Sequence, residues 1–426
     1  MDQIPYREIS EISQLPAPDA TGFISRYVFQ YIDFNQVPQY VAAGHLFSDC
    51  CFLGCDIPSE MEGRIGQTCL IFPRMGRTYN VFRTRLYDGE TLYAGYDPEN
   101  EESYGSCFDA RVYADYIEKG QQCDDIRETL GRTLHDRAMS SAMREFLSRF
   151  DERQVVAIMG GHALLRSDEG YRRVALISKK LTEKGKLMAS GGGPGAMEAT
   201  HLGAWMAGRT EAEFDDAMDI LSAAQTFRDE GWLRTALEVM HKYPQHKYRS
   251  LGIPTWFYGH EPSTPFATDI AKYFYNSLRE DTLLAIAKGG IIYSPGSAGT
   301  IQEIFQDAAQ NHYETFGAPS PMVFLGKEFF NKETMEDIVL AINSEGEGGE
   351  GQADIFIEKF AKLQAEKAAA AAENAEPEPD DAEVKTEAGE KVASENITAD
   401  DKPKAVSVPS GDSSTTPNPE VEVSLT

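Results

Sequence analysis

The stretch PGSAGTIQE at 295–303 combines a loop of small residues with a threonine and a glutamate. An apolar run at 290–293 precedes the loop and helical apolar spacing begins at Ile301, which predicts a buried strand, a loop and a helix. Backbone N–H groups at such a helix start are unpaired and carry the positive end of the helix dipole, so they favour phosphate. The predicted phosphate-binding residues are Gly296, Ser297, Ala298, Gly299 and Thr300.

Thr300 and Glu303 have two interpretations. The pattern T-x-x-E is a capping box, in which both side chains only close the start of a helix. Alternatively, the hydroxyl of Thr300 contacts an anion, and Glu303, one turn further along, carries out acid–base chemistry. These residues alone leave both interpretations open, but a second loop of the same kind favours a ligand site.

The second loop lies in SGGGPGAMEATHLGAW, where three glycines follow a predicted strand at 186–189 and precede a helix at 195–205. A further strand at 155–159 ends in the sequence GGH. Neither loop has the G-x-G-x-x-G spacing of dinucleotide-binding proteins, and the P-loop motif is absent, so nucleoside-triphosphate hydrolysis has no support. Two predicted phosphate-binding loops favour a small phosphorylated nucleotide as the ligand.

These loops require a sheet that brings their ends together. Strand and helix patterns alternate from 155 to 309, which predicts a Rossmann-like, doubly wound parallel sheet within a domain at 151–366. Residues 1–150 are expected to form a smaller α/β domain. Its expected strands and extended segments are 47–54, 68–72, 81–87 and 91–96, and its expected helices are 108–118 and 134–150. A helical, charged insertion at 209–248 could be a lid or a dimer surface.

Composition limits the function classes. The net charge is −28 and the pI about 4.7, which argues against a broad nucleic-acid surface. No apolar run is long enough to span a membrane, and the first residues lack a secretory pattern, so a cytoplasmic location is expected. The stretch 367–426 is acidic, rich in Ala, Ser, Thr and Pro and free of aromatics, which predicts a disordered tail.

Other candidate residues have ordinary explanations. The six cysteines lie in the first 123 residues without zinc-site spacing, so we expect reduced core thiols. His135 and Asp136 could form an acid–base pair, but neighbours in a helix do not share a face. No metal constellation is visible, and no cofactor is expected.

Several motifs in order resemble one family. GGHALL at 160–165, GGGPGAMEA at 191–199, EPSTPF at 261–266 and PGSAGTIQE at 295–303 resemble the Lonely Guy-type phosphoribohydrolases, closest to their nucleotide 5′-monophosphate nucleosidase branch. The family was formerly mislabelled as lysine decarboxylases. The resemblance covers about 155–322. The family pattern P-G-G-x-G-T-x-x-E is met except at Ser297, which replaces its second glycine.

The resemblance implies hydrolysis of the N-glycosidic bond of a nucleoside 5′-monophosphate to free base and ribose 5-phosphate. It implies Glu303 and Arg279 as catalytic residues, with Arg279 on the helix before the last glycine-loop strand. It also implies a homo-oligomer, a dimer or larger. The residues expected on the base and ribose side are Gly161, His162, Gly192, Gly193, Gly195, Met197 and Glu198.

Two other functions remain open from the sequence. A non-catalytic nucleotide sensor could use the same fold, because fold alone does not fix activity. A DNA-handling relative would need a basic groove for single strands, which the acidic composition disfavours.

Overall fold

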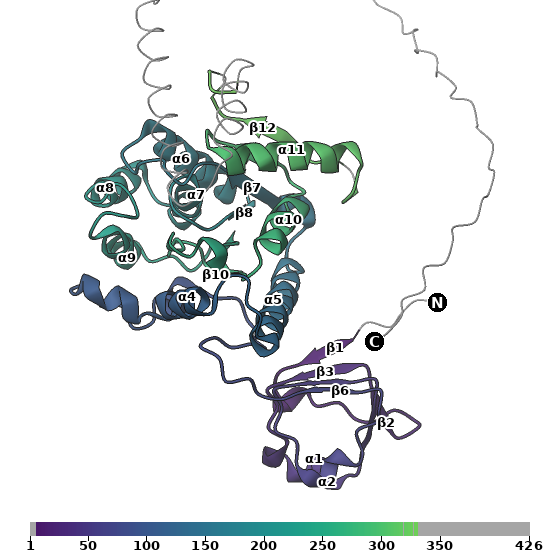
Figure 1. Cartoon of the computed structure of the whole chain (residues 1–426). Helices are drawn as coiled ribbons and strands as arrows, with labels where there is room; N and C mark the ends of the chain where they lie inside the picture. The colour runs from purple at the N-terminus through teal and green to yellow at the C-terminus, as the bar shows by residue number, and fades with distance from the viewer. Residues whose placement is uncertain (1–5, 318, 327, 331–426) are drawn as a thin grey trace, which may run out of the picture. The chain divides into compact units, whose positions relative to one another are not determined.

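The computed structural model describes residues 6–317, 319–326 and 328–330, and it confirms the expected α/β class with parallel sheets (Figure 1). The expected tail at 367–426 and the end of the expected second domain lie outside the described residues. None of the described helices is long and apolar enough to cross a membrane.

A six-stranded parallel sheet forms the larger part. Its order is β10-β9-β8-β7-β11-β12. The chain therefore builds outward from β7 to β10, returns, and adds β11 and β12 on the other side of β7. The direction of winding changes between β7 and β11, which is where doubly wound sheets bind ligands. The strands are β7 (Val155–Met159), β8 (Leu187–Ser190), β9 (Ser250–Gly252), β10 (Asp269–Ile270), β11 (Ile291–Tyr293) and β12 (Met322–Phe324).

Helices cover both faces of this sheet, which explains why its central strands β7 and β11 are apolar throughout. In β7, Val156 and Ile158 pack in one cluster with residues of helices α6 and α7, whereas Val155, Ala157 and Met159 pack in the opposite cluster. The first face carries α6 (Glu169–Glu183), α7 (Ala196–Trp205), α8 (Glu211–Leu221) and α9 (Trp232–Lys242). The second carries α5 (Ile126–Leu147), α10 (Asn276–Ile286) and α11 (Ala298–His312).

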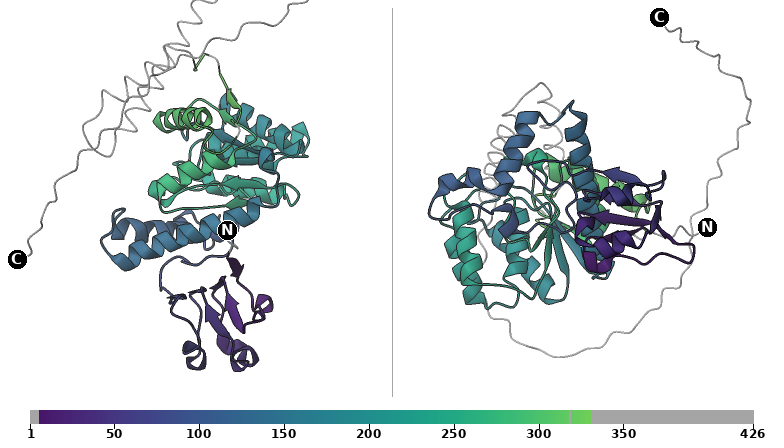
Figure 2. Two further views of the ribbon diagram at one scale, coloured as in Figure 1. Left: turned by 90° about the vertical axis from the view of Figure 1, so that its right-hand side faces the viewer. Right: turned by 90° about the horizontal axis from the view of Figure 1, so that it is seen from below.

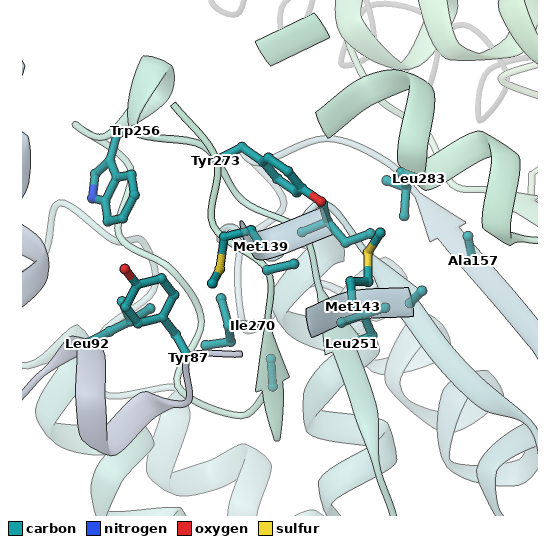
Figure 3. Packing of buried hydrophobic residues seen from close by; sticks show 14 of the residues in the cluster. Tyr87, Leu92, Met139, Met143, Ala157, Leu251, Trp256, Ile270, Tyr273 and Leu283 are labelled. Carbon is teal, nitrogen blue, oxygen red and sulfur yellow. The ribbon is translucent and has the colours of Figure 1, made fainter. Parts of the chain in front are cut away.

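Residues before 150 contribute to the same core. Met139 and Met143 of α5 lie beside Leu251 and Ile270 of the sheet (Figure 3). Helices α3 (Gly89–Leu92) and α4 (Phe108–Lys119) supply further members of this cluster. The boundary expected near residue 150 thus falls between segments that share one hydrophobic cluster.

Residues 7–72 form a parallel-stranded coil with a separate hydrophobic cluster inside it, visible in Figures 1 and 2. One side is a four-stranded sheet in the order β1-β3-β5-β6, and the other is the pair β2-β4. The strands are β1 (Arg7–Ile9), β2 (Phe23–Ser25), β3 (Tyr27–Gln30), β4 (Leu46–Ser48), β5 (Cys51–Leu53) and β6 (Leu70–Phe72); the short helices are α1 (Pro38–Ala42) and α2 (Ser59–Glu62).

Successive turns of the coil stack equivalent residues on one another. Ser25 pairs with Ser48 in register, and their hydroxyl oxygens are 2.9 Å apart. The rings of Phe29 and Phe52 stack inside the coil with centroids 5.0 Å apart. All six cysteines are free thiols, and burial raises the pKa of Cys50 to about 12, as befits a core residue.

Two segments differ from the sequence-based expectation. Residues 81–87 and 91–96 are not strands; the first has only an isolated bridge from Tyr87 to Ile270, and the second overlaps α3. The cause is local, because Asp88 accepts a hydrogen bond from the Thr91 N–H and so starts a short helix. The remaining helices are 3₁₀ turns at Ile12–Gln14, Phe34–Gln36, Glu101–Ser106, Glu152–Gln154 and Trp256–Tyr258.

Candidate functional site

Three loops meet at the carboxyl ends of β7, β8 and β11, and we call residues 160–162, 191–195 and 295–300 the loop junction. The N–H of Gly161 donates to the carbonyl of Pro295 at 3.1 Å. The carbonyl of Gly161 accepts from Ala196 at 3.0 Å. Gly195 has φ of +67°, and a Cβ there would lie 2.5 Å from that carbonyl, so only glycine fits.

The start of α11 excludes the capping-box interpretation of Thr300 and Glu303. The helix begins at Ala298 with Ser297 as its N-cap, and the Ser297 side chain makes no capping hydrogen bond. Thr300 is therefore the third helical residue, and the capping box with Glu303 is not formed. Thr300 is buried against Gly296, whereas a Cβ at Gly299 would enter open space. The first N–H groups of α11 thus have no capping hydrogen bond from the Ser297 side chain, and Ala298 and Gly299 are exposed at this turn.

Glu303 and Arg279 lie together, as predicted. Nη1 of Arg279 is 3.6 Å from Oε1 of Glu303, and the two side chains are only 13% and 14% exposed. Burial raises the pKa of Glu303 to about 7, while Arg279 opposes this shift and Glu280 adds to it. A carboxylate near half-ionisation at neutral pH is well suited to proton transfer.

Arg279 has unused hydrogen-bonding capacity. Its Nε is buried and has no hydrogen-bond partner in the described part of the chain. A Cβ at Gly191 would lie 3.5 Å from its Nη1, so the guanidinium also borders the second glycine loop. A buried cation with an unpaired donor beside an open helix N-terminus favours an anionic ligand.

Met197 packs against the first half of the second loop. A Cβ at Gly191 would lie 2.7 Å from its sulfur, and one at Gly193 would lie 2.9 Å from its Cε. The same position at Gly193 is 3.7 Å from Oε2 of Glu261. Met197 therefore packs against the glycine loop between Gly191, which borders Arg279, and Gly193, which borders Glu261.

His162 follows β7 and pairs with Glu261. Its Nδ1 is 3.1 Å from Oε1 of Glu261, and the two side chains are 28% and 15% exposed. This imidazole–carboxylate pair is a second group capable of proton transfer.

Tyr258 lies near the Arg279–Glu303 pair and near Glu261. Burial raises the pKa of its hydroxyl, the carboxylates of Glu280, Glu261 and Glu303 act in the same direction, and Arg279 opposes them. The Arg279 guanidinium carbon is 6.0 Å from its ring centroid, yet the residue is 39% exposed. A half-exposed ring in this position can stack on a base.

Two expected ligand residues have structural roles. Glu198 is fully buried; its carboxylate accepts hydrogen bonds from Arg166 at 2.5 and 3.0 Å and from the Tyr171 hydroxyl at 3.0 Å. This placement does not support the expected contact of Glu198 with a ribose. Gly192 has φ of +73°. Its N–H donates to the hydroxyl of Ser190, and its carbonyl accepts from the N–H of Thr264.

His135 and Asp136 also lie away from the loop junction. Asp136 is fully buried and accepts from the N–H groups of Phe274 and Tyr275 at 2.9 Å each. His135 lies between Asp136 and the hydroxyl of Tyr87. The side chains of His135, Asp136 and Tyr87 are all buried in the core.

Sequence reasoning missed Glu261 and Tyr258. Glu261 begins the motif EPSTPF, which carried the family resemblance without a chemical role, and Tyr258 stands three residues earlier without any motif. Their loop joins the site only through folding. Comparison with known proteins adds nothing further, since neither a protein-family model nor a curated protein matches this chain.

Proposed function

We propose that this protein hydrolyses the N-glycosidic bond of nucleoside 5′-monophosphates, releasing the base and ribose 5-phosphate. The observation that carries the proposal is the pairing of Glu303 with Arg279 beside the open start of α11. A carboxylate suited to proton transfer, a cation with an unused hydrogen-bond donor and a helix N-terminus of the kind that binds phosphate lie together there. The resemblance to Lonely Guy-type phosphoribohydrolases supports the same reaction.

In this proposal the 5′-phosphate binds the N–H groups of the first turn of α11, and Arg279 supplies the neighbouring positive charge. Glu303 takes a proton from the attacking water. Its carboxylate also stabilises the positive charge that develops on the sugar as the bond to the base breaks. The buried position of both side chains strengthens these electrostatic interactions.

The test is base release from a panel of nucleoside 5′-monophosphates, followed by chromatography, with the matching nucleosides as substrates lacking phosphate. We expect release from monophosphates only. Glu303→Gln should lower turnover by about 100-fold or more while nucleotide binding persists. The control Glu238→Gln alters an exposed glutamate on α9 and should leave turnover unchanged.

Two outcomes contradict the proposal. Equal turnover of Glu303→Gln and the unaltered protein would remove Glu303 from the reaction. Nucleotide binding without any base release, unchanged in Glu303→Gln, would instead support the nucleotide sensor.

A further inference from the structure

We propose that His162, oriented by Glu261, protonates the departing base in the reaction proposed above. The inference rests on that proposed function and adds a second proton-transfer group to it. Glu303 would then act on the water, and His162 on the leaving group.

The chemistry requires such a donor. When the bond between C1′ and the base nitrogen breaks, its electron pair stays on the base, and an unprotonated purine or pyrimidine anion is a poor leaving group. A proton delivered to the base, at N7 for a purine, removes this charge. The water oxygen bonds to C1′ and its proton passes to Glu303, so the atoms and charges balance.

Glu303 is poorly suited to both tasks at once. It must be ionised to accept the proton of water, and an ionised carboxylate has no proton to give to the base. Arg279, its neighbour at 3.6 Å, is a permanent cation that does not release a proton at neutral pH. A separate acid is therefore needed, and His162 is the titratable residue that the loop after β7 contributes to the junction.

The geometry gives His162 the features of such an acid. The Nδ1 contact with Glu261 fixes the orientation of the ring. No hydrogen bond of Nε2 to another described residue is present, and the side chain is partly exposed, so Nε2 can meet a ligand. The backbone carbonyl of His162 lies against Gly195, which holds it at the second glycine loop.

His162 and Glu303 belong to one site. Glu261 borders Gly193 while Arg279 borders Gly191, so the two pairs flank the same short loop. Tyr258 lies close enough to Glu261 and Glu303 for both carboxylates to influence its hydroxyl. A base resting near Tyr258 would thus have the His162 pair and the Glu303 pair within the same site.

The test compares two leaving groups in the full-length protein. Nucleoside 5′-monophosphates need protonation of the base, whereas 4-nitrophenyl β-ribofuranoside 5-phosphate releases a stable phenolate without it. We expect His162→Ala to lose about 100-fold or more in turnover of the monophosphates and little with the nitrophenyl substrate. Glu303→Gln should lose activity on both. Glu261→Gln, altering a positioning residue, should show a smaller loss with the same dependence on the leaving group.

His260→Ala is the matched control, because His260 also faces Glu261, at 3.8 Å, but is largely exposed. It should behave as the unaltered protein on both substrates. If His162→Ala lost turnover equally on both substrates while its thermal stability was unchanged, the proposal would be overturned. It would also be overturned if only His260→Ala lost turnover of the monophosphates selectively. Failure of the unaltered protein to cleave either substrate would instead overturn the proposed function and this inference with it.

Discussion

Two neighbours move the pKa of Glu303 in opposite directions. Burial is the main cause of its raised value, about 7; Arg279 lowers it and Glu280 raises it. Because the proton acceptor must be ionised, kcat/KM should rise on the acidic side of its pH profile, as pH increases through about 7. Arg279→Gln should move the midpoint to higher pH, and Glu280→Gln should move it to lower pH.

The measurement is a pH profile of kcat/KM for the three proteins. Opposite displacements distinguish direct electrostatic effects from general damage to the site, which would lower the rate without moving the midpoint. Equal midpoints in all three proteins would contradict the assignment of Glu303 as the titrating group.

Glu198 allows a second prediction at this scale. Arg166 binds it with two nitrogens, and both side chains are buried. Glu198→Ala leaves the Arg166 charge unpaired and should lower the free energy of unfolding by about 3–5 kcal/mol. Denaturant unfolding measures this. If stability were unchanged and nucleotide binding were weaker, the structural role of Glu198 would be wrong and a direct contact with the ligand would be supported.

At the scale of elements, two glycines three residues apart at the start of α11 should respond in opposite ways. A Cβ at Gly296 would collide with Thr300 and lie 2.8 Å from the Gly161 N–H, so Gly296→Ala should destabilise the loop junction. Gly299 lies in the helix with open space beside it, so Gly299→Ala should stabilise the free protein by about 0.5–1 kcal/mol.

Ligand binding gives the second readout of this pair. If phosphate occupies the space at Gly299, the added methyl group should weaken nucleotide binding despite the gain in stability. Thermal unfolding with and without a nucleoside monophosphate measures both effects. Unchanged affinity in Gly299→Ala would contradict phosphate binding at this turn.

The sequence predicted this element well but missed its start. Ile291 to Tyr293 and the apolar face of α11 follow from periodicity, because both are core elements. Thr300 resembled an N-cap because T-x-x-E is also the capping-box pattern. The cap falls on Ser297 instead, since Thr300 packs under Gly296 and so belongs inside the helix. Gly296 in turn packs on Gly161 of the loop after β7, and such packing between loops distant in sequence cannot be derived from local spacing.

At the scale of the whole molecule, Asp136 connects α5 to the site. Its carboxylate accepts from Phe274 and Tyr275 immediately before α10, the helix that carries Arg279. Asp136→Asn replaces a charged acceptor and should cost about 1.5–3 kcal/mol of stability. Turnover should fall as well, because α10 loses its anchor.

Ser140→Ala is the control for this prediction. It removes a hydroxyl of α5 that contacts the Tyr273 side chain without touching the backbone ahead of α10. Unfolding and base release are measured on both variants. If Asp136→Asn lost stability but kept full turnover, the hydrogen bonds of Asp136 would not be needed to position Arg279.

The N-terminal coil shows where sequence reasoning stops. Its turns are equivalent in space, but the aligned stretches FISRYVF and LFSDCCF share only the serine and the final phenylalanine. Stacking requires only apolar residues inside and residues tolerant of the corner conformation, such as Arg26 and Asp49 with positive φ. Many sequences meet these conditions, so no clear repeat is visible.

The strand order also fixes when the site can exist. Gly161 and Gly296 touch, yet the ribosome makes β11 long after β7. At ordinary rates of synthesis this interval is on the order of ten seconds, during which β7 presents an unpaired edge to the cell. A nascent chain released early would therefore be inert and prone to aggregate. The enzyme that we propose becomes active only when its last strands have emerged.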